Sequence, residues 1–279
     1  MSQLSFTELC SAFENVPAKA KPTLIEKPVS PLSQPARMIT SDAARKQFIS
    51  VFAHTGQNMR RWDVFRDFIT LAASELDLAQ IRTPENIESS RQICDRYETA
   101  DHDKMKKLFC LMVTALEGEF HDFLGSIFME LELGSDHMGQ FFTPYTIQLM
   151  MAKMLTGDIA ADVQRQGWIA LYEPACGAAG MVLAYAQCML EAGLNPSEQL
   201  YVECIDIDPI AADMAFIQLS LLGIAAKVIT GNTLTNKFTR VRYTPIYYIN
   251  EWENRLALRQ QVEALAKVMQ QATQTAVLS

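Results

Sequence analysis

A glycine-containing segment, Glu173-Pro-Ala-Cys-Gly-Ala-Ala-Gly180, has the residue types of a loop that binds a nucleotide-like ligand. It follows a short apolar run, Trp168–Tyr172, and precedes a helical pattern. Gly177 permits a tight turn and close approach of a ligand, and the free N–H groups of the next helix suit an anion. Glu173 can accept a hydrogen bond from an ammonium group. An ordinary strand-to-helix turn can have the same residues, so this segment alone does not identify a ligand.

Two further polar side chains follow predicted strands. Asp206 ends one apolar run and is placed to accept hydrogen bonds from both hydroxyls of a ribose. Asp208 competes for that role, although an aspartate before a proline also suits the N-cap of a helix. Asn232 ends the next run, where its amide can pair with the edge of an adenine or serve as a turn residue. Ligands of open parallel sheets bind beyond the carboxyl ends of the strands, so we expect one common site.

The elements that must position these residues alternate between strand and helix. Apolar runs at 168–172, 200–207 and 225–229 are separated by helical patterns at 181–191 and 210–222. This order predicts an α/β fold with a Rossmann-like, mainly parallel sheet at 136–279. A helical domain is predicted at 39–135, where Ser41 and Asp42 suit an N-cap. Residues 1–38 are predicted to be an N-terminal segment and linker, because five prolines between 17 and 35 exclude a helix.

Composition restricts the class of protein. The net charge is −8 and the pI is about 5.1, which argues against a chain that holds DNA by bulk charge. Six cysteines without a C-x-x-C pair argue against a metal site and for free thiols in a reducing cytoplasm. No apolar run reaches the ~20 residues of a membrane span, and no signal peptide is visible.

Four segments together carry a resemblance. Gly139-Gln-Phe-Phe-Thr-Pro144, Glu173–Gly180, Asp206-Ile-Asp-Pro209 and Gly231-Asn-Thr-Leu234 occur in this order. They resemble, in turn, the G-Q-F-F-T-P, D-P-A-C-G-T-G-G, E-I-x-P and G-D/N-T/S-L segments of adenine-N6 DNA methyltransferases of the type I modification-subunit family. The resemblance covers roughly residues 40–235 and implies that 136–279 is a truncated S-adenosylmethionine (SAM)-dependent methyltransferase domain.

The resemblance also implies SAM as the cofactor and a role for each matching residue. The methionine part would contact Phe142, Thr143 and Pro144. The amino-acid and ribose portion would be lined by Glu173, Ala175, Gly177 and Gly180. The ribose would bind to Asp206, and the adenine would contact Ile207 and Asn232.

The catalytic signature of that family, N-P-P-Y or N-P-P-F, is absent from the sequence. Such a motif holds the amino group of a flipped adenine for attack on the methyl group. At the corresponding distance the chain reads Arg240-Val-Arg-Tyr-Thr-Pro-Ile-Tyr-Tyr248, in which Pro245 aligns and Tyr243 replaces the asparagine. Tyr247 or Tyr248 could stack on a base or be ordinary strand aromatics. The catalytic residues therefore stay unknown.

These features leave alternatives open. One is a SAM-binding DNA adenine methyltransferase of a DNA modification or restriction-modification system. A second is a catalytically inactive relative that acts as a regulator or interaction protein. A third is a small-molecule methyltransferase. Arg240 and Arg242 are the only close basic pair near the expected edge, so DNA binding by the chain alone should be weak. A shortened sheet would have an open edge, which a homo-oligomer or a partner protein would complete.

Overall fold

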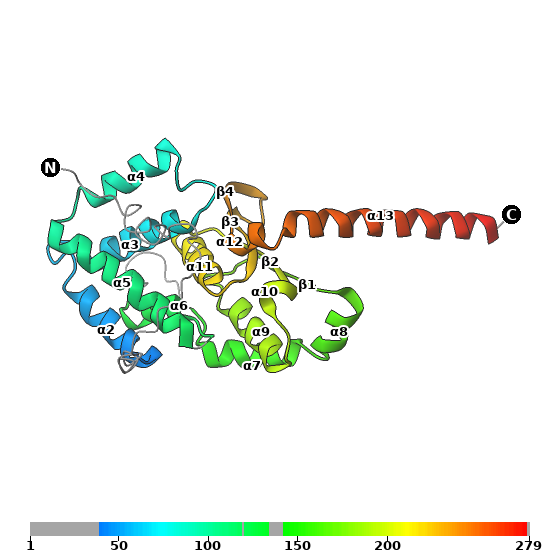
Figure 1. The fold of residues 1–279 in the computed structure, drawn as a ribbon, viewed down its shortest axis with the longest axis horizontal. Helices are drawn as coiled ribbons and strands as arrows, with labels where there is room; N and C mark the ends of the chain where they lie inside the picture. Colours follow the sequence, from blue (N-terminus) through cyan, green and yellow to red (C-terminus); the bar gives the residue numbers. More distant parts are fainter. Residues whose placement is uncertain (1–38, 119, 134–141, 278–279) are drawn as a thin grey trace, which may run out of the picture. The chain divides into compact units, whose positions relative to one another are not determined.

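The computed structural model describes residues 39–118, 120–133 and 142–277 (Figure 1). Gly139, Gln140 and Phe141 of the first family-like segment lie outside these residues, as does the predicted linker at 1–38. Thr40–Ser279 forms one compact unit. Its division into domains at 39–135 and 136–279 stays a prediction.

Five helices form the first part of this unit: α2 (Ser41–Ala53), α3 (Arg61–Leu76), α4 (Pro84–Cys94), α5 (Thr99–Gly118) and α6 (Phe123–Glu130). The N-cap of α2 is Thr40, whose hydroxyl accepts a hydrogen bond from the Ala43 N–H, so the prediction of Ser41 was wrong by one residue. Thr83 caps α4, and Pro84 follows at the first helical position.

Aromatic side chains fill the space between these helices. Phe48 contacts Phe68 and Phe123 edge-to-face, with ring centroids 5.6 and 5.3 Å apart. Phe65 and Phe128 make a further edge-to-face contact, and all five rings are buried. The apolar stripes of the sequence are therefore a packed core, as the amphipathic pattern predicts.

The sheet contains β1 (Ile169–Glu173), β2 (Leu200–Asp206), β3 (Ala225–Asn232) and β4 (Lys237–Tyr243), in that spatial order. The first three strands run parallel, with Glu173 beside Cys204 and Cys204 beside Val228. The parallel α/β prediction is confirmed for these strands. β4 differs, because it pairs antiparallel with β3.

Six more helices accompany the sheet: α7 (Tyr145–Leu155), α8 (Ile159–Gln166), α9 (Gly180–Glu191), α10 (Pro196–Gln199), α11 (Pro209–Leu221) and α12 (Pro245–Ile249). The last helix, α13 (Trp252–Val277), extends away from the sheet (Figure 1). α11 contacts β2 and β3 as well as α3 and α6, and positions 211–219 are all buried. α11 thus joins the sheet and the preceding helices in one core. The described residues contain no helix that could span a membrane.

An aromatic cluster closes the amino-terminal edge of the sheet. Trp168, Tyr201, Tyr247 and Trp252 pack there, with the two tryptophan rings 5.1 Å apart. Tyr248 contacts Tyr247 beside this cluster. The antiparallel direction of β4 brings the chain back to this edge, so Tyr247 and Tyr248 lie at the end of the strands opposite the glycine loop. Both belong to helix α12, so the reading as strand aromatics is wrong.

Candidate functional site

The glycine loop between β1 and α9 is tied to the end of β2. The Cys176 N–H donates to the Ile205 carbonyl at 2.9 Å, and the Gly177 N–H donates to Asp206 Oδ2 at 2.8 Å. Gly177 has a φ of 52° and Ala179 has a φ of 70°, both in the left-handed region. The loop therefore makes two sharp turns before α9, and its backbone faces the carboxyl edge of the sheet.

Asp206 lies at the centre of this edge. Its Oδ1 accepts from the Asp208 N–H at 2.9 Å, while Oδ2 holds the Gly177 N–H. Burial raises the pKa of Asp206, and the hydrogen bonds from the Asp208 and Gly177 amides oppose that shift. Each oxygen keeps acceptor capacity for a hydroxyl.

Asp208 has the structural role that the sequence left open. Its Oδ1 accepts from the Ile210 N–H at 2.9 Å and caps α11. The cap occupies one oxygen of Asp208, whereas Asp206 joins two segments of the edge. Asp208 therefore has the N-cap role, and the ribose role of Asp206 stays a prediction.

Asn232 ends β3 and stabilises the turn that follows. Its Oδ1 accepts from the Leu234 and Thr235 N–H groups at 2.9 and 3.1 Å. The turn role is thus observed, and it leaves Nδ2 to donate to an acceptor. Thr233, which the sequence did not single out, donates its hydroxyl to the Pro174 carbonyl at 2.7 Å. This bond brings the end of β3 to the loop after β1.

The remaining predicted residues differ in exposure. Ile207 is 61% exposed beside Asp206, so its side chain is accessible to an apolar ring. Ala175 is exposed and Glu173 is partly buried at the end of β1. The Glu173 carboxylate lies 3.4 Å from the Ala175 N–H, so it is only weakly engaged within the loop.

Phe142, Thr143 and Pro144 lead into α7 beside the glycine loop. A Cβ at Gly177 would lie 2.8 Å from the Phe142 ring, so this ring packs directly on the glycine. Phe142 also contacts Phe128 of α6, with ring centroids 5.0 Å apart. Thr143 and Pro144 are exposed. The structure thus places Phe142 against the glycine loop, and the role of this segment in SAM binding stays a prediction.

Gly180 faces a side chain that sequence reasoning missed. A Cβ at this position would lie 2.7 Å from Cδ and Nε2 of Gln148 and closer still to its Oε1. Gln148 is buried and donates to the Thr143 carbonyl at 2.8 Å, while its Oε1 has no partner. The space beside Gly180 is therefore filled by Gln148. Only a residue without a side chain fits there.

Cys176 is the one thiol within the loop. Contact with the Cys204 thiol and burial raise its pKa well above the ordinary value. The thiol therefore stays protonated near neutral pH and does not supply a nucleophile.

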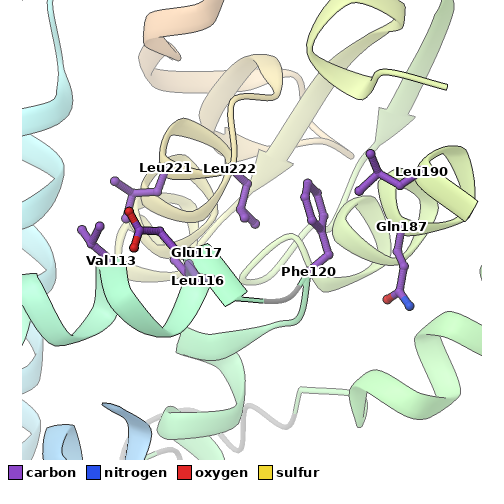
Figure 2. Close-up of a pocket in the computed structure, with 8 residues that line it drawn as sticks. All are labelled: Val113, Leu116, Glu117, Phe120, Gln187, Leu190, Leu221 and Leu222. Atoms are coloured by element: carbon purple, nitrogen blue, oxygen red, sulfur yellow. The ribbon is translucent and has the colours of Figure 1, made fainter. Parts of the chain in front are cut away.

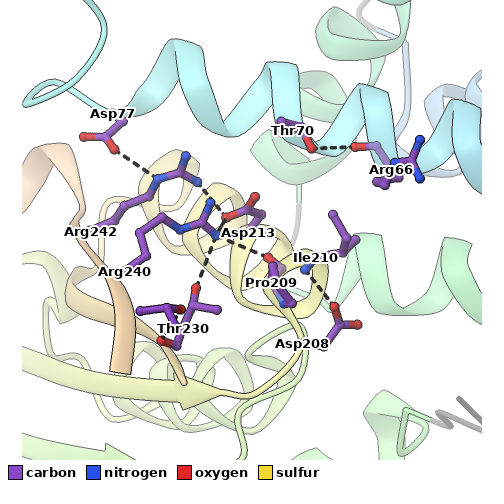
Figure 3. A network of polar contacts seen from close by, with 11 residues as sticks. Arg66, Thr70, Asp77, Asp208, Pro209, Ile210, Asp213, Thr230, Arg240 and Arg242 are labelled. Carbon is purple, nitrogen blue, oxygen red and sulfur yellow. Dashed lines mark hydrogen bonds and ion pairs between the residues drawn. The ribbon is translucent and has the colours of Figure 1, made fainter. Parts of the chain in front are cut away.

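Arg240 and Arg242 are engaged within the fold (Figure 3). Both pair with the buried carboxylate of Asp213, and Arg242 also pairs with Asp77 at 3.0 Å. Arg242 is 10% exposed at its side chain. These charges therefore join β4 to α3 and α11 within the fold.

A pocket of about 520 Å³ lies elsewhere, at the ends of α5, α9 and α11 (Figure 2). Glu117, Gln187 and Leu222 are among its lining residues. Gln187 and Leu222 lie at the carboxyl ends of helices whose amino ends are at the strand edge. This pocket is therefore separate from the candidate site.

Comparisons with known proteins concern the part of the chain that contains this site. Residues 119–256 match the family model described as N-6 DNA Methylase, and this segment contains the glycine loop, Asp206 and Asn232. No match was found among curated proteins. A solved structure, a putative class I S-adenosylmethionine-dependent methyltransferase from Listeria monocytogenes, is 13% identical with a TM-score of 0.37. The alignment covers 70% of this chain and 55% of that one, so this chain spans about half of its length. Residues 119–256 of this chain are therefore similar to N-6 DNA methylases.

Proposed function

We propose that the chain binds SAM at the carboxyl edge of β1–β3, as the cofactor-binding part of a DNA adenine-N6 methyltransferase. The observation that carries the proposal is the hydrogen bond between Gly177 and Asp206, which joins the glycine loop to the acidic residue expected to hold a ribose. Asn232 and Thr233 bring the third strand end to the same place. The family match supports this choice of ligand.

The geometry supports a role for each side of the ligand. The two carboxylate oxygens of Asp206 would accept from the ribose hydroxyls, and Asn232 Nδ2 would donate to the adenine edge. Ile207 would pack on the adenine ring. The amino end of α9 would face the carboxylate of the methionine part, and Glu173 its ammonium group. Phe142, Thr143 and Pro144 would complete that end, with Ala175, Gly177 and Gly180 forming the loop.

Methyl transfer would need a base-binding segment at this edge. In the described residues, β4 runs back to the opposite ends of the strands. It also occupies the side of β3 that faces away from β2. β1 is paired only with β2, and Tyr172 of β1 is 55% exposed. A strand added in parallel beside β1 would end next to the glycine loop. We propose that the base-binding segment comes from such a strand.

Helix α7 has a second apolar surface that a partner could cover. The helix is apolar on the face toward α9 and also on its free face. The free face exposes Ile147, Met150, Met151, Met154 and Leu155. A helix that is apolar all round is normally buried on both sides. A second copy of this chain related by a two-fold axis would place its own β1 antiparallel to the first. Its glycine loop would then lie at the opposite ends of the strands, so a strand from a different polypeptide fits better.

The substrate, on this proposal, is DNA, within a DNA modification or restriction-modification system in the cytoplasm. The net charge of −8 and the internal pairing of Arg240 and Arg242 favour weak DNA binding by this chain alone. The same observations, with the direction of β4, favour the second candidate function. In that case, the chain binds SAM or a protein partner and acts as an inactive regulator.

Calorimetric titration with SAM tests the cofactor site. The wild-type chain should bind, and Asp206→Ala should lose binding because the ribose acceptor is gone. Asp103→Ala, which removes an exposed carboxylate on α5, should bind as the wild type does. No heat from the wild type would contradict the proposal.

Labelled SAM with mixed DNA separates the two functions. We expect no label on DNA from the pure chain, because the described residues bring no base-binding segment to the site. Robust transfer by the pure chain would show that the catalytic residues lie within it. It would exclude the inactive regulator.

A further inference from the structure

Gln218 is a polar side chain at the centre of the molecule. It lies on α11 and is 0% exposed. Its Oε1 accepts from the Leu124 N–H at 2.9 Å. Its Nε2 donates to Asp122 Oδ1 at 2.9 Å and to the Ala178 carbonyl at 2.7 Å. Both amide hydrogens are therefore used, and the side chain has one preferred orientation.

The first two of these bonds hold the amino end of α6. Asp122 is the N-cap of α6 and also accepts from the Gly125 N–H at 2.8 Å. Gln218 takes the Leu124 N–H and binds the cap itself. The Gln218 amide thus supplies hydrogen-bond partners at the buried amino end of α6. In the chain, α6 precedes the glycine loop by about fifty residues.

The third bond reaches the glycine loop. The peptide unit between Ala178 and Ala179 is held on both sides: its carbonyl accepts from Gln218, and its N–H donates to the Cys176 carbonyl at 2.8 Å. Ala179 has a φ of 70°, a conformation that alanine rarely adopts. Such a residue persists only when its surroundings determine the orientation of the adjoining peptides.

Removing the Gln218 donor would leave a buried carbonyl in that strained turn. Ala178 is 1% exposed, so solvent does not readily replace the donor. An unsatisfied buried carbonyl is costly, and the loop would relieve the cost by rotating this peptide. The same short turn contains the Gly177 N–H that binds Asp206, so a change in the turn would disturb that hydrogen bond.

We propose that Gln218 is a positioning residue for the SAM site, acting through the Ala178–Ala179 peptide. The inference rests on the proposed function. Its consequence is that the amino end of α6 is coupled energetically to the cofactor site. Gln218 touches no ligand itself.

The test compares Gln218→Met with a matched variant, Thr244→Val. Methionine fills a similar volume without the amide. Thr244 is also 0% exposed, with its hydroxyl accepting from the Ala226 N–H and donating to the Ile224 carbonyl at the other edge of the sheet. Both variants should melt at a lower temperature. SAM affinity should fall about tenfold in Gln218→Met alone, because part of the binding free energy is spent on re-forming the loop.

Hydrogen exchange of the loop amides gives a readout that needs no SAM. The Ala179 amide should exchange faster in Gln218→Met than in Thr244→Val at equal global stability. Gln218→Asn, which is one methylene shorter and cannot span the three partners, is a milder variant and should show the same change if the methionine variant does not fold.

The outcomes separate the two ideas. If Asp206→Ala loses SAM while Gln218→Met binds within twofold of the wild type and its loop exchange is unchanged, the positioning role is wrong and the cofactor site stands. If the wild type does not bind SAM, the proposed function is wrong. Equal loop exchange in Gln218→Met and Thr244→Val would then also overturn the positioning role.

Discussion

Replacing Gly180 with alanine should force the new methyl group into the side chain of Gln148. The added Cβ would lie 2.7 Å from both Cδ and Nε2 of Gln148. Gln148 is 6% exposed and bonded to the Thr143 carbonyl, so it cannot move aside without losing that bond. Gly180 is the first residue of α9, where alanine itself is well tolerated.

The magnitude follows from these opposing effects. Overpacking a buried position costs about 1–3 kcal/mol, and the lost hydrogen bond of Gln148 costs about 1 kcal/mol. Alanine in place of glycine in a helix returns at most about 1 kcal/mol. We expect Gly180→Ala to lower the free energy of unfolding by about 2 kcal/mol. In Gln148→Ala the obstructing amide is absent, so the double variant should recover most of that loss.

Urea denaturation of the wild type, both single variants and the double variant gives the coupling free energy. We expect a coupling of about 2 kcal/mol. Gly180→Ala combined with Thr244→Val is the control pair, because Thr244 lies at the other edge of the sheet and should add independently. Additivity of Gly180→Ala and Gln148→Ala within about 0.5 kcal/mol would refute the packing role of Gly180.

Three further predictions concern the site, the ion pairs and the aromatic cluster. SAM affinity should fall as the pH is lowered toward the pKa of Asp206, which burial raises. The reason is that only the ionised carboxylate accepts from both ribose hydroxyls. In Asp206→Asn, calorimetric titration with SAM should show no such pH dependence. Arg242→Met should lower the free energy of unfolding by about 3 kcal/mol, since it leaves the buried carboxylates of Asp77 and Asp213 short of a partner; an unchanged urea midpoint would contradict this. Trp252→Ala should cost about 3–5 kcal/mol, because the ring, at the start of α13, is fully buried against Trp168 and Tyr201. Thermal melting followed by circular dichroism measures the loss, and a loss below about 1 kcal/mol would argue against the cluster.

The predicted site could be located from sequence because its residues follow strands. Apolar runs that alternate with helical patterns imply parallel strands, and parallel strands end at one edge. Glu173, Asp206 and Asn232 were therefore expected together. The structure places each at a strand end and joins the ends through Gly177 and Thr233.

The sequence could not reveal the partners of the loop. Gln148 and Gln218 lie within helical patterns, where a lone glutamine carries no signal of its own. Their roles come from residues about 30 to 95 positions away that the fold brings within hydrogen-bond distance. Thr233 next to Asn232 was missed for the same reason, because its partner belongs to another strand end.

The direction of β4 could not be predicted either. The run from Arg240 to Tyr248 has the spacing expected for a catalytic segment, and strand propensity does not distinguish a parallel from an antiparallel neighbour. Pairing with β3 across a short turn imposed the antiparallel direction. Because β4 runs antiparallel to β3, Tyr247 lies in the aromatic cluster, and Arg240 and Arg242 pair with Asp213.

The sequence by itself determined the α/β class, the helical region before it, and the three strand ends that form the candidate SAM site, because these depend on local periodicity and on residue types at turns. Only the tertiary structure decided that β1 has one free side among the described residues, that Gln148 fills the space at Gly180, and that Gln218 holds the glycine loop. These features depend on which distant segments pack together. A buried polar group needs a hydrogen-bond partner among its neighbours, and closely packed neighbours leave no room for an extra atom.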